Sequence, residues 1–296
     1  MTSALGTRIA AQLDRPVRDE VAAFARKLAQ DAGAQAALFY GSNLRTGELE
    51  GVLDFYLLLP GPQQEAIWPR VSYHELALGG TVLRAKVATM ALGTFARACR
   101  GESRDTTIWA RFVQPSALVF AASDDAREQV TAALAQAAST AARLAVALGP
   151  EEGTAQEYWR ALFRATYRAE FRVEKAGRED SILSVNAAHF DGLLPLALAA
   201  DGIAFEQRGQ RLRPALDTRQ RAAILRWWDK RRRLGKPLNV IRLLKASTTF
   251  EGAARYAAWK IERHTGVPVE VTPWRERHPV LSAPAVLWQV WRQRAR

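Results

Sequence analysis

The chain has 296 residues, of which 48% are hydrophobic, a composition that fits a folded globular protein and excludes an intrinsically disordered one. Its one cysteine, Cys99, excludes an internal disulfide and a cysteine-rich zinc site. The formal net charge is +12, and residues 206–296 hold 21 of the 42 Lys and Arg but only 7 of the 30 Asp and Glu. We therefore expect an anionic partner for that region: phosphate, nucleic acid or an acidic membrane surface.

The N-terminal residues show no signal peptide, because their helical pattern carries Asp14, Asp19 and Glu20 and no apolar core precedes a cleavage site. The longest apolar run near the middle, residues 193–200, is far shorter than the roughly 20 residues that a membrane-spanning helix needs. A single cysteine favours a reducing compartment. These features predict a cytoplasmic protein.

The first 122 residues predict a small α+β domain. Residues 16–32 are expected to form an amphipathic helix, because apolar side chains recur there at helical spacing and Gly33 is placed to end it. Apolar runs separated by polar or Gly/Pro-containing segments then predict four strands, at residues 36–40, 52–59, 81–90 and 116–121.

The following residues predict a mostly helical domain at 123–235 and a basic C-terminal helical region at 236–296. Asp124 and Asp125 offer an N-cap to an alanine-rich helix that Gly149 and Pro150 end. A second helix is expected at residues 155–174, where four arginines spaced four residues apart share one face. Further helices are expected around residues 181–200, 217–233, 250–264 and 284–296.

Asp54 interrupts the apolar strand expected at residues 52–59. Because strand side chains alternate between faces, Asp54 shares a face with Tyr56, whereas Phe55 and Leu57 point to the other face. We expect helices to cover the Phe55 face, which leaves Asp54 on the face opposite the core. A carboxylate held by a rigid strand suits a metal ion, and a carboxylate on a half-exposed strand is equally consistent with simple solvation.

Gly41 and Ser42 lie about a dozen residues before Asp54, and such a turn can bring backbone N–H groups and a hydroxyl to a phosphate. A strand, a Gly-Ser turn and a strand acid together resemble the signature of the nucleotidyltransferase superfamily. In that superfamily strand carboxylates hold Mg²⁺ on a nucleoside triphosphate while an acceptor oxygen attacks the α-phosphorus.

The strands offer Asp54 no second acid. Tyr56 occupies the place where an Asp-x-Asp pattern would put one, and the strand expected at 81–90 carries Arg84 and Lys86 instead. A further metal ligand must then come from the helical region or from one of three acids between the strands, Glu75, Glu102 or Asp105.

The series of motifs over residues 36–262 resembles one family, the mitochondrial translocator assembly and maintenance proteins, which are peripheral phosphatidate cytidylyltransferases. Its motifs resemble Tyr40-Gly41-Ser42, Leu53-Asp54-Phe55, the strand segment around Lys86, Arg111 with Pro115, Glu170-Phe171-Arg172, His189-Phe190, and the serine-containing stretch at 245–252. The chain departs from the family where Ala110 and Gln114 replace Gly and Lys and where Glu170 replaces Asp.

The resemblance implies a nucleotidyltransferase domain with a small mixed sheet, followed by a winged-helix-like domain. It implies that the substrates are CTP and phosphatidic acid, and that Mg²⁺ is the cofactor. The roles that it implies are Asp54 and Lys86 as catalytic residues, Gly41, Ser42, Arg111 and Arg172 as contacts to the substrate phosphates, and Asp54 with Glu170 as metal ligands.

Two C-terminal segments, residues 226–233 and 287–294, mix tryptophans with arginines. Such residues suit an anionic membrane surface, and they also suit RNA; alternatively the tryptophans are core and the arginines solvated. A lipid substrate must be collected from a bilayer, so we expect peripheral association with the inner face of a membrane and give nucleic acid second place. Two other functions stay open: nucleotidyl transfer to RNA or a small alcohol, and a degenerate, non-catalytic binding module.

Overall fold

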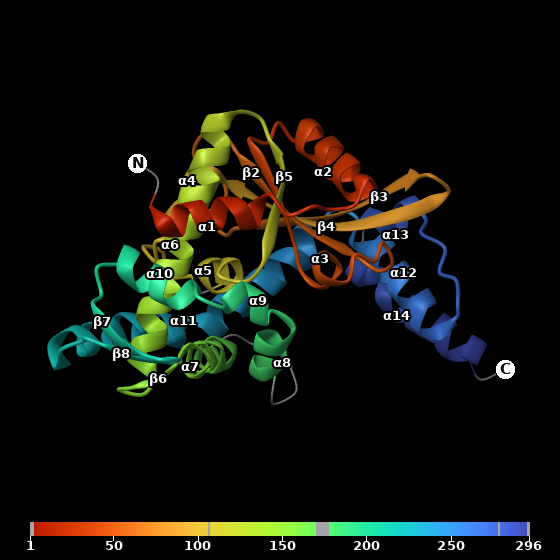
Figure 1. Ribbon diagram of the computed structural model, residues 1–296. Coiled ribbons are helices and arrows are strands. Elements are labelled where there is room, and N and C mark those ends of the chain that lie inside the picture. Colours follow the sequence, from red (N-terminus) through yellow and green to blue (C-terminus); the bar gives the residue numbers. More distant parts are fainter. Residues whose placement is uncertain (1–2, 106, 170–177, 278, 295–296) are drawn as a thin grey trace.

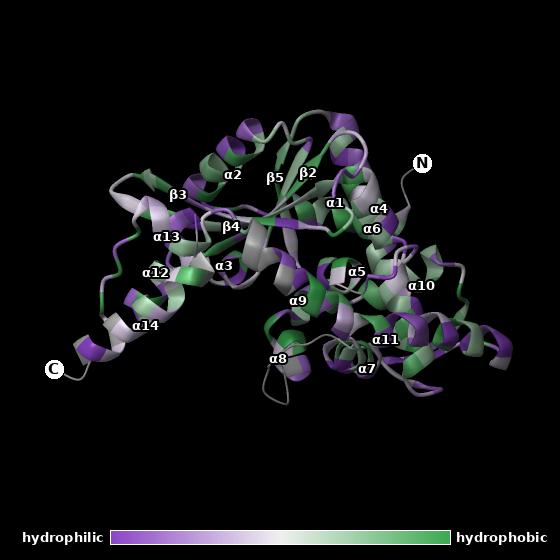
Figure 2. Ribbon diagram, turned by 180° about the vertical axis from the view of Figure 1, so that it is seen from behind, coloured by the Kyte–Doolittle hydropathy of each residue, from purple (hydrophilic) through white to green (hydrophobic). Residues whose placement is uncertain are grey.

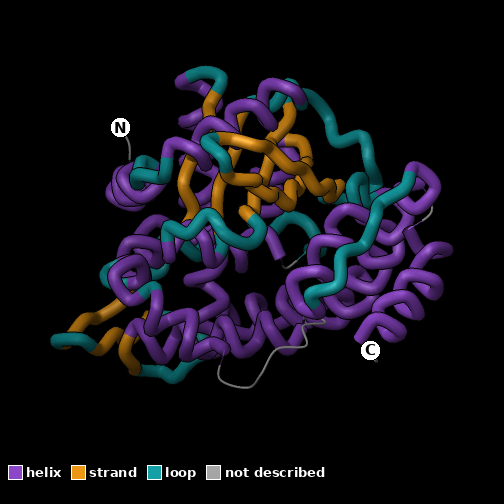
Figure 3. Tube along the Cα trace, turned by 90° about the vertical axis from the view of Figure 1, so that its right-hand side faces the viewer, coloured by secondary structure: helices purple, strands orange, loops and turns teal. Residues whose placement is uncertain are grey.

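The computed structural model describes residues 3–105, 107–169, 178–277 and 279–294. A mixed sheet packs against a mostly helical region, and the C-terminal helices return to lie beside the sheet (Figure 1). The same arrangement is visible from the side, where the strands lie above the layer of helices (Figure 3). The protein therefore has the α+β architecture that the sequence predicts.

The main sheet has five strands in the order β3-β4-β2-β1-β5, and a second sheet has three in the order β6-β8-β7. The strands are β1 (Ala36–Tyr40), β2 (Leu53–Leu59), β3 (Arg70–Leu78), β4 (Thr81–Ala91), β5 (Ser116–Ala121), β6 (Gly153–Thr154), β7 (Phe205–Arg208) and β8 (Arg211–Pro214). In the main sheet β2 and β4 are parallel, and all other neighbours are antiparallel. The four predicted strands are confirmed, whereas the edge strand β3 was missed because polar residues interrupt both of its faces.

The helices account for most of the remaining described residues. They are α1 (Ala4–Leu13), α2 (Asp19–Asp31), α3 (Ser42–Thr46), α4 (Leu92–Cys99), α5 (Thr107–Phe112), α6 (Asp124–Leu148), α7 (Ala155–Ala169), α8 (Arg178–Val185), α9 (Ala187–Phe190), α10 (Leu193–Ala200), α11 (Thr218–Thr249), α12 (Ala253–Thr265), α13 (Pro273–Arg277) and α14 (Pro279–Arg294). The predicted helices are confirmed within the described residues, although positions 170–174 of the helix predicted at 155–174 lie outside them. Helix α11 is longer than expected, and the helices α1, α3, α4, α5 and α13 were not predicted.

Helices cover both faces of the main sheet. The amphipathic helix α2 packs on the face that carries Phe55 and Leu57, with its hydrophilic side outward (Figure 2). The other face, which carries Tyr56 and Leu58, packs against α4, α5 and α6. The expectation that Asp54 lies opposite the core is therefore wrong: Tyr56 and Leu58 are 2% and 0% exposed, and the face opens only at its end, near Asp54.

The long helix α6 is the centre of the helical region and contacts α1, α4, α5, α7, α10 and α11. Its N-cap is Ser123, whose hydroxyl accepts a hydrogen bond from the Ala126 N–H at 3.1 Å, so the predicted cap lies one residue too late. Asp124 and Asp125 lie in the first turn, where negative charge favours the helix dipole. Among the described helices only α6 is by itself long and apolar enough to cross a bilayer, but 72% of that stretch is buried inside the fold.

One hydrophobic core runs from the sheet into the helical region and includes Leu38, Trp109, Leu144 and Phe163. The division at residue 122 thus does not separate two cores, since α4 and α5 pack directly on α6. Helix α11 also continues without a break through residue 235. The predicted domain boundaries therefore describe changes in composition along a chain that packs continuously.

The C-terminal helices are attached to the outer edge of the main sheet. The Tyr73 N–H in β3 donates to the Glu251 carbonyl at 2.8 Å, just before α12. A Cβ atom at Gly252 would lie 2.7 Å from the Tyr73 carbonyl oxygen, so this close approach requires glycine. The Tyr256 ring then packs on the Tyr73 ring with centroids 5.4 Å apart, which places α12 beside β3 and β4 (Figure 1).

The contact between α7 and α11 depends on Gly235, where a Cβ atom would lie 2.4 Å from the Ala169 carbonyl oxygen. We expect Gly235→Ala to lower the free energy of unfolding by about 1–3 kcal/mol, because the two backbones must separate. Urea denaturation measures the loss. Gly93→Ala is the matched control, since Gly93 lies in a helix with no atom near its Cβ position. This variant should raise the free energy of unfolding by about 0.5–1 kcal/mol. Equal effects of the two substitutions would contradict this account.

Candidate functional site

Five residues, one from each strand of the main sheet, form a row across it. The register pairs Ser116 with Tyr40, Tyr40 with Asp54, Asp54 with Lys86, and Lys86 with Tyr73. Directly paired residues on neighbouring strands point to the same face, so these side chains share one face. The row lies where β1 ends and β2 begins, which is the end of the sheet that the core leaves open.

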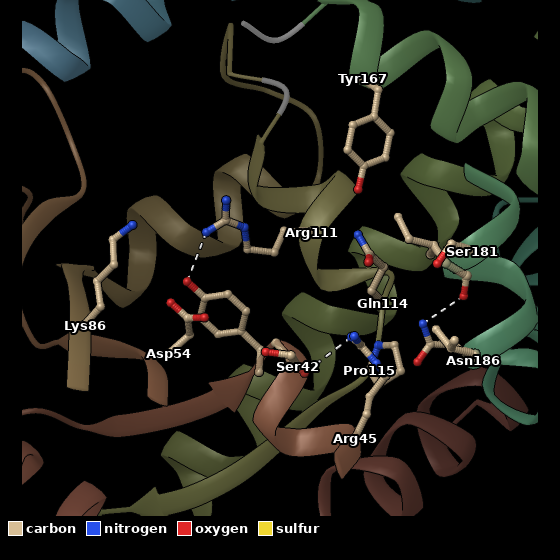
Figure 4. A pocket seen from close by; sticks show the side chains of 14 residues that line it. Ser42, Arg45, Asp54, Lys86, Arg111, Gln114, Pro115, Tyr167, Ser181 and Asn186 are labelled. Atoms are coloured by element: carbon tan, nitrogen blue, oxygen red, sulfur yellow. Dashed lines mark hydrogen bonds between the residues drawn. The ribbon is translucent and has the colours of Figure 1, made fainter. Parts of the chain in front are cut away.

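A cleft of about 330 Å³ opens at this row, between the sheet and the helical region (Figure 4). Its lining consists of Tyr40, Gly41, Ser42, Arg45, Asp54, Lys86, Arg111, Gln114, Pro115, Tyr167, Ser181, Ile182, Val185 and Asn186. The structure thus brings together five of the predicted site residues, Gly41, Ser42, Asp54, Lys86 and Arg111. The two others, Glu170 and Arg172, lie outside the described residues.

Gly41 permits a close approach of the β1–α3 turn to the Asp54 carboxylate. Its backbone has φ +94° and ψ −161°, a conformation that is essentially restricted to glycine. A Cβ atom there would lie 2.9 Å from Asp54 Oδ2. The turn is further held by Asn43, whose amide donates to the Glu48 and Glu50 carbonyls at 3.0 and 2.7 Å. Glycine is therefore needed at position 41 for backbone geometry, and Ser42 is exposed at the cleft.

Asp54 and Lys86 perturb each other within the cleft. Burial raises the pKa of Asp54, and the positive charges of Lys86 and Arg111 oppose that rise. Burial lowers the pKa of Lys86, and the Asp54 charge opposes that fall. A desolvated carboxylate is stabilised by a bound cation and a desolvated ammonium by a bound anion, so the pair suits a ligand that carries both, such as a metal ion on a phosphate.

Arg111 is positioned by two tyrosines. Its Nη1 donates to the Tyr40 hydroxyl at 3.0 Å (the dashed line from Arg111 in Figure 4). Its guanidinium lies 5.2 Å from the Tyr40 ring centroid and 6.0 Å from that of Tyr56. Burial raises the pKa of Tyr40, which keeps its hydroxyl protonated. The short helix α5 carries Arg111, and its Phe112 packs on the Tyr56 ring at 5.1 Å. Tyr56 is thus a core residue that supports Arg111, which explains why no second acid stands there.

The helical region supplies the other half of the cleft. Tyr167 points into the cleft from α7, while Ser181 and Asn186 come from α8 and its C-terminal end (Figure 4). Gln114 lies between the two halves, and its amide donates to the Ala110 carbonyl at 3.2 Å. Sequence reasoning did not place these residues in the site, because only packing decides which helix faces the sheet. Gln114 alone carried a signal, as a departure from the family pattern.

The described residues offer a divalent cation little beyond Asp54. Asp54 is the only carboxylate among the residues that line the cleft, and the part of the chain that the structure describes holds no cluster of three metal-binding side chains. Mg²⁺ is commonly held by one or two carboxylates, with substrate phosphates and water completing its coordination. The donor set therefore fits Mg²⁺ that arrives with a phosphate ligand.

The other acids considered as metal ligands lie outside the cleft lining and have partners elsewhere. Glu75 pairs with Arg84 at 3.4 Å, Glu102 pairs with Arg100 at 2.6 Å, and the buried Asp105 pairs with Arg242 at 2.7 Å. Each of these carboxylates already has a cation partner in the fold. None of these three carboxylates is therefore available beside Asp54 as a second metal ligand.

Two histidines, His189 of the His-Phe pair and His74 of β3, also make structural contacts. His189 Nε2 lies 2.8 Å from the Val113 carbonyl oxygen, and burial lowers the pKa of His189 to about 4, so the ring is neutral at pH 7 and donates to that oxygen. His74 lies 2.8 Å from the Ser72 hydroxyl.

The regularly spaced arginines of α7 form ion pairs with the next helix. Arg160 pairs with Asp180 and Arg164 with Glu179, both in α8.

A comparison with known protein families finds no family that matches this chain, and no curated protein matches it either. The function must accordingly be argued from the cleft, where three cationic side chains, Arg45, Lys86 and Arg111, lie around the Asp54 carboxylate. Cationic groups of this kind are donors to which phosphate oxygens hydrogen-bond.

The geometry predicts that Gly41→Ala is more damaging than its backbone conformation alone requires. A non-glycine residue in a positive-φ conformation costs about 1–2 kcal/mol, and the new methyl group must also displace Asp54. Gly41→Ala in an Asp54→Ala background is the matched control, because it keeps the same backbone strain and removes the carboxylate that the methyl group meets. Urea denaturation should show a larger loss of unfolding free energy for Gly41→Ala in the wild-type background, and equal losses would show that the Asp54 contact is unimportant.

Proposed function

We propose that the protein is an Mg²⁺-dependent nucleotidyltransferase, and specifically a phosphatidate cytidylyltransferase that makes CDP-diacylglycerol from CTP and phosphatidic acid. One observation carries the proposal. Residues from four separate segments, which the sequence motifs single out for phosphate chemistry, line one cleft around Asp54. The β7–β8 hairpin beside the helical region also supports a winged-helix-like description of that region.

In this reaction an oxygen of the acceptor phosphate attacks the α-phosphorus of CTP. The bond from that phosphorus to the bridging oxygen breaks, and pyrophosphate leaves. Ser42 and Arg45 bind the triphosphate from the turn after β1, and Arg111 binds it as a planar fork held by Tyr40. Lys86 supplies a further positive charge next to Asp54.

Asp54 would hold the Mg²⁺ together with phosphate oxygens, and Glu170 is the proposed second ligand. When bound, Mg²⁺ neutralises charge on the phosphates during the in-line displacement. The raised pKa of Asp54 fits this role, because the carboxylate has lost water contacts that a cation can replace.

The helical half of the cleft suits the base. Gln114, Ser181 and Asn186 offer amide and hydroxyl groups that hydrogen-bond to the edge of a base, and the Tyr167 ring offers a stacking surface. Arg172 is proposed as a further phosphate contact. The cleft would then hold the nucleotide across the junction of the sheet and the helical region.

Two other functions are compatible with the same cleft. The acceptor could be RNA or a small alcohol, because the described residues that bind the triphosphate do not define the acceptor. The domain could also bind ligands without catalysis, which is favoured by the place of Tyr56 in the aromatic core, where it cannot act as a second carboxylate.

The C-terminal helix α14 is proposed to contact an anionic membrane. Trp288 and Trp291 lie three residues apart on this helix and are 59% and 68% exposed, and Leu281 is 69% exposed. Arg292 stacks over the Trp288 ring at 5.3 Å, so aromatic and cationic groups share one side. This combination suits the interface of an anionic bilayer, and the proposed location is the inner, cytoplasmic face.

The enzymatic proposal predicts that the purified protein, with CTP, Mg²⁺ and vesicles containing phosphatidic acid, forms CDP-diacylglycerol and releases pyrophosphate. Asp54→Asn should lower kcat at least about 100-fold, because removing a group that acts on charge in the transition state typically has that effect. Chromatography of the labelled lipid measures the product. Undiminished turnover in Asp54→Asn would contradict the proposal, and product with RNA or glycerol but not with phosphatidic acid would identify the other acceptor class.

The membrane proposal predicts that the protein floats with vesicles that contain 30 mol% phosphatidic acid and much less with neutral vesicles. Removing both tryptophans, by Trp288→Ala with Trp291→Ala, should weaken vesicle binding at least tenfold, since each ring loses its buried apolar area. Added salt should also weaken binding. Binding that survives both changes would place the membrane contact elsewhere, and competition by RNA would favour a nucleic-acid partner.

A further inference from the structure

We infer that Lys260 of α12, beside the cleft, forms a second anion-binding point together with Lys86, which lines the cleft. This point binds the phosphate monoester of the acceptor. The inference rests on the proposed function, which requires a second anionic reactant beside Asp54. It makes the C-terminal region part of the site.

The row of residues across the sheet leads directly to α12. Tyr73 follows Lys86 in this row, and the Tyr73 ring contacts Tyr256 on the first turn of α12. The hydrogen bond from the Tyr73 N–H to the Glu251 carbonyl fixes the chain where the helix begins. Helix α12 therefore borders the row on the β3 side, opposite the turn that carries Ser42.

The rotation of α12 about its axis is fixed by a stack of cations on Trp259. Arg84 lies 5.4 Å and Arg263 lies 5.3 Å from the Trp259 ring centroid. Arg84 is two residues from Lys86 on β4, so both point to the face of the sheet that carries the cleft. Lys260 lies one turn after Tyr256, with its ammonium 5.9 Å from the Tyr256 ring, so it shares the side of α12 that packs on Tyr73.

Lys260 and Lys86 act on each other electrostatically. The charge of Lys260 adds to the burial and the Arg111 charge that lower the pKa of Lys86. Lys260 is exposed to solvent, and among the described residues it takes part in none of the ion pairs made by the C-terminal helices. Two neighbouring ammonium groups repel each other, and a bound dianion removes that repulsion. The arrangement is therefore a site for an anion of high charge.

Asp54 divides the cations of the cleft into two sets. Arg45 and Arg111 lie on the β1 side, and Lys86 and Lys260 lie on the β3 side. Two anionic reactants can approach each other only if cations offset their mutual repulsion. A triphosphate on the first set and a phosphate monoester on the second would meet beside Asp54, where the attacking oxygen must reach the α-phosphorus.

The test measures binding of each reactant separately. Calorimetry with dihexanoyl phosphatidic acid, a water-soluble lipid, and with glycerol 3-phosphate reports on the monoester, while a non-hydrolysable α,β-methylene analogue of CTP with Mg²⁺ reports on the nucleotide. Lys260→Ala should lower the affinity for both monoesters about tenfold, as expected for the loss of one charged hydrogen bond. It should change the affinity for the nucleotide analogue less than twofold. Arg45→Ala should show the reverse pattern. If dihexanoyl phosphatidic acid binds and glycerol 3-phosphate does not, the acyl chains are also needed for binding.

Two further variants separate the site from general charge effects. Lys230→Ala removes the same charge from an exposed position on α11 and should leave all three affinities unchanged. Lys260→Arg keeps the charge and should retain most of the monoester affinity. Unchanged monoester affinity in Lys260→Ala, an equal loss of nucleotide affinity, or no monoester binding by the wild-type protein overturns the inference.

The same variants distinguish this inference from the proposed function. Monoester binding that depends on Lys260, in a protein that forms no nucleotidyl product, supports the second anion point and overturns the transferase proposal. Product formation with the same acceptor KM in wild type and Lys260→Ala supports the transferase and overturns the role of Lys260.

Discussion

The register of β2 between its two neighbours is the constraint on which the site depends. Its antiparallel pairing with β1 places Asp54 opposite Tyr40, and its parallel pairing with β4 places Asp54 beside Lys86. A shift of one residue would turn Asp54 into the α2-covered core and Phe55 into the cleft. Such a shift is prevented because Phe55 and Leu57 on one face, and Tyr56 and Leu58 on the other, are all buried.

A strand that is buried on both faces can carry a carboxylate only at its end. Asp54 is the second residue of β2, at the point where the helices that cover Tyr56 no longer reach. There the Gly41 turn approaches the carboxylate closely, and Lys86 and Arg111 oppose the effect of burial on its pKa. The same partial burial that makes Asp54 unfavourable as an isolated charge makes it receptive to a cation.

Three regions of the chain meet at this end of the sheet. The strands supply Asp54 and Lys86, the helical region supplies Tyr167 and Asn186, and α12 borders the row through Tyr256 and Lys260. Because α6 ties the first two regions into one core and the Glu251 carbonyl ties the third to β3, their relative positions are set by packing. Among the described residues, this construction places Arg45, Arg111 and Lys86 around the one carboxylate that lines the cleft.

The sequence alone determined the α+β class, the strands β1, β2, β4 and β5, and the long helix α6. It also singled out five candidate phosphate- or metal-binding residues, Gly41, Ser42, Asp54, Lys86 and Arg111. The secondary structure follows from local periodicity and Gly41, Ser42 and Asp54 from residue chemistry, which a single sequence displays. Arg111 and the role of Lys86 came from the resemblance to a known family. It could not reveal β3, because polar residues obscure its pattern, or the covering of both sheet faces, because Tyr56 and Leu58 become core only when α5 and α6 pack on them. Only the tertiary structure decided that Gln114, Tyr167 and Asn186 line the cleft with Asp54 and that α12 lies beside β3, since contacts between distant segments depend on strand register and helix packing.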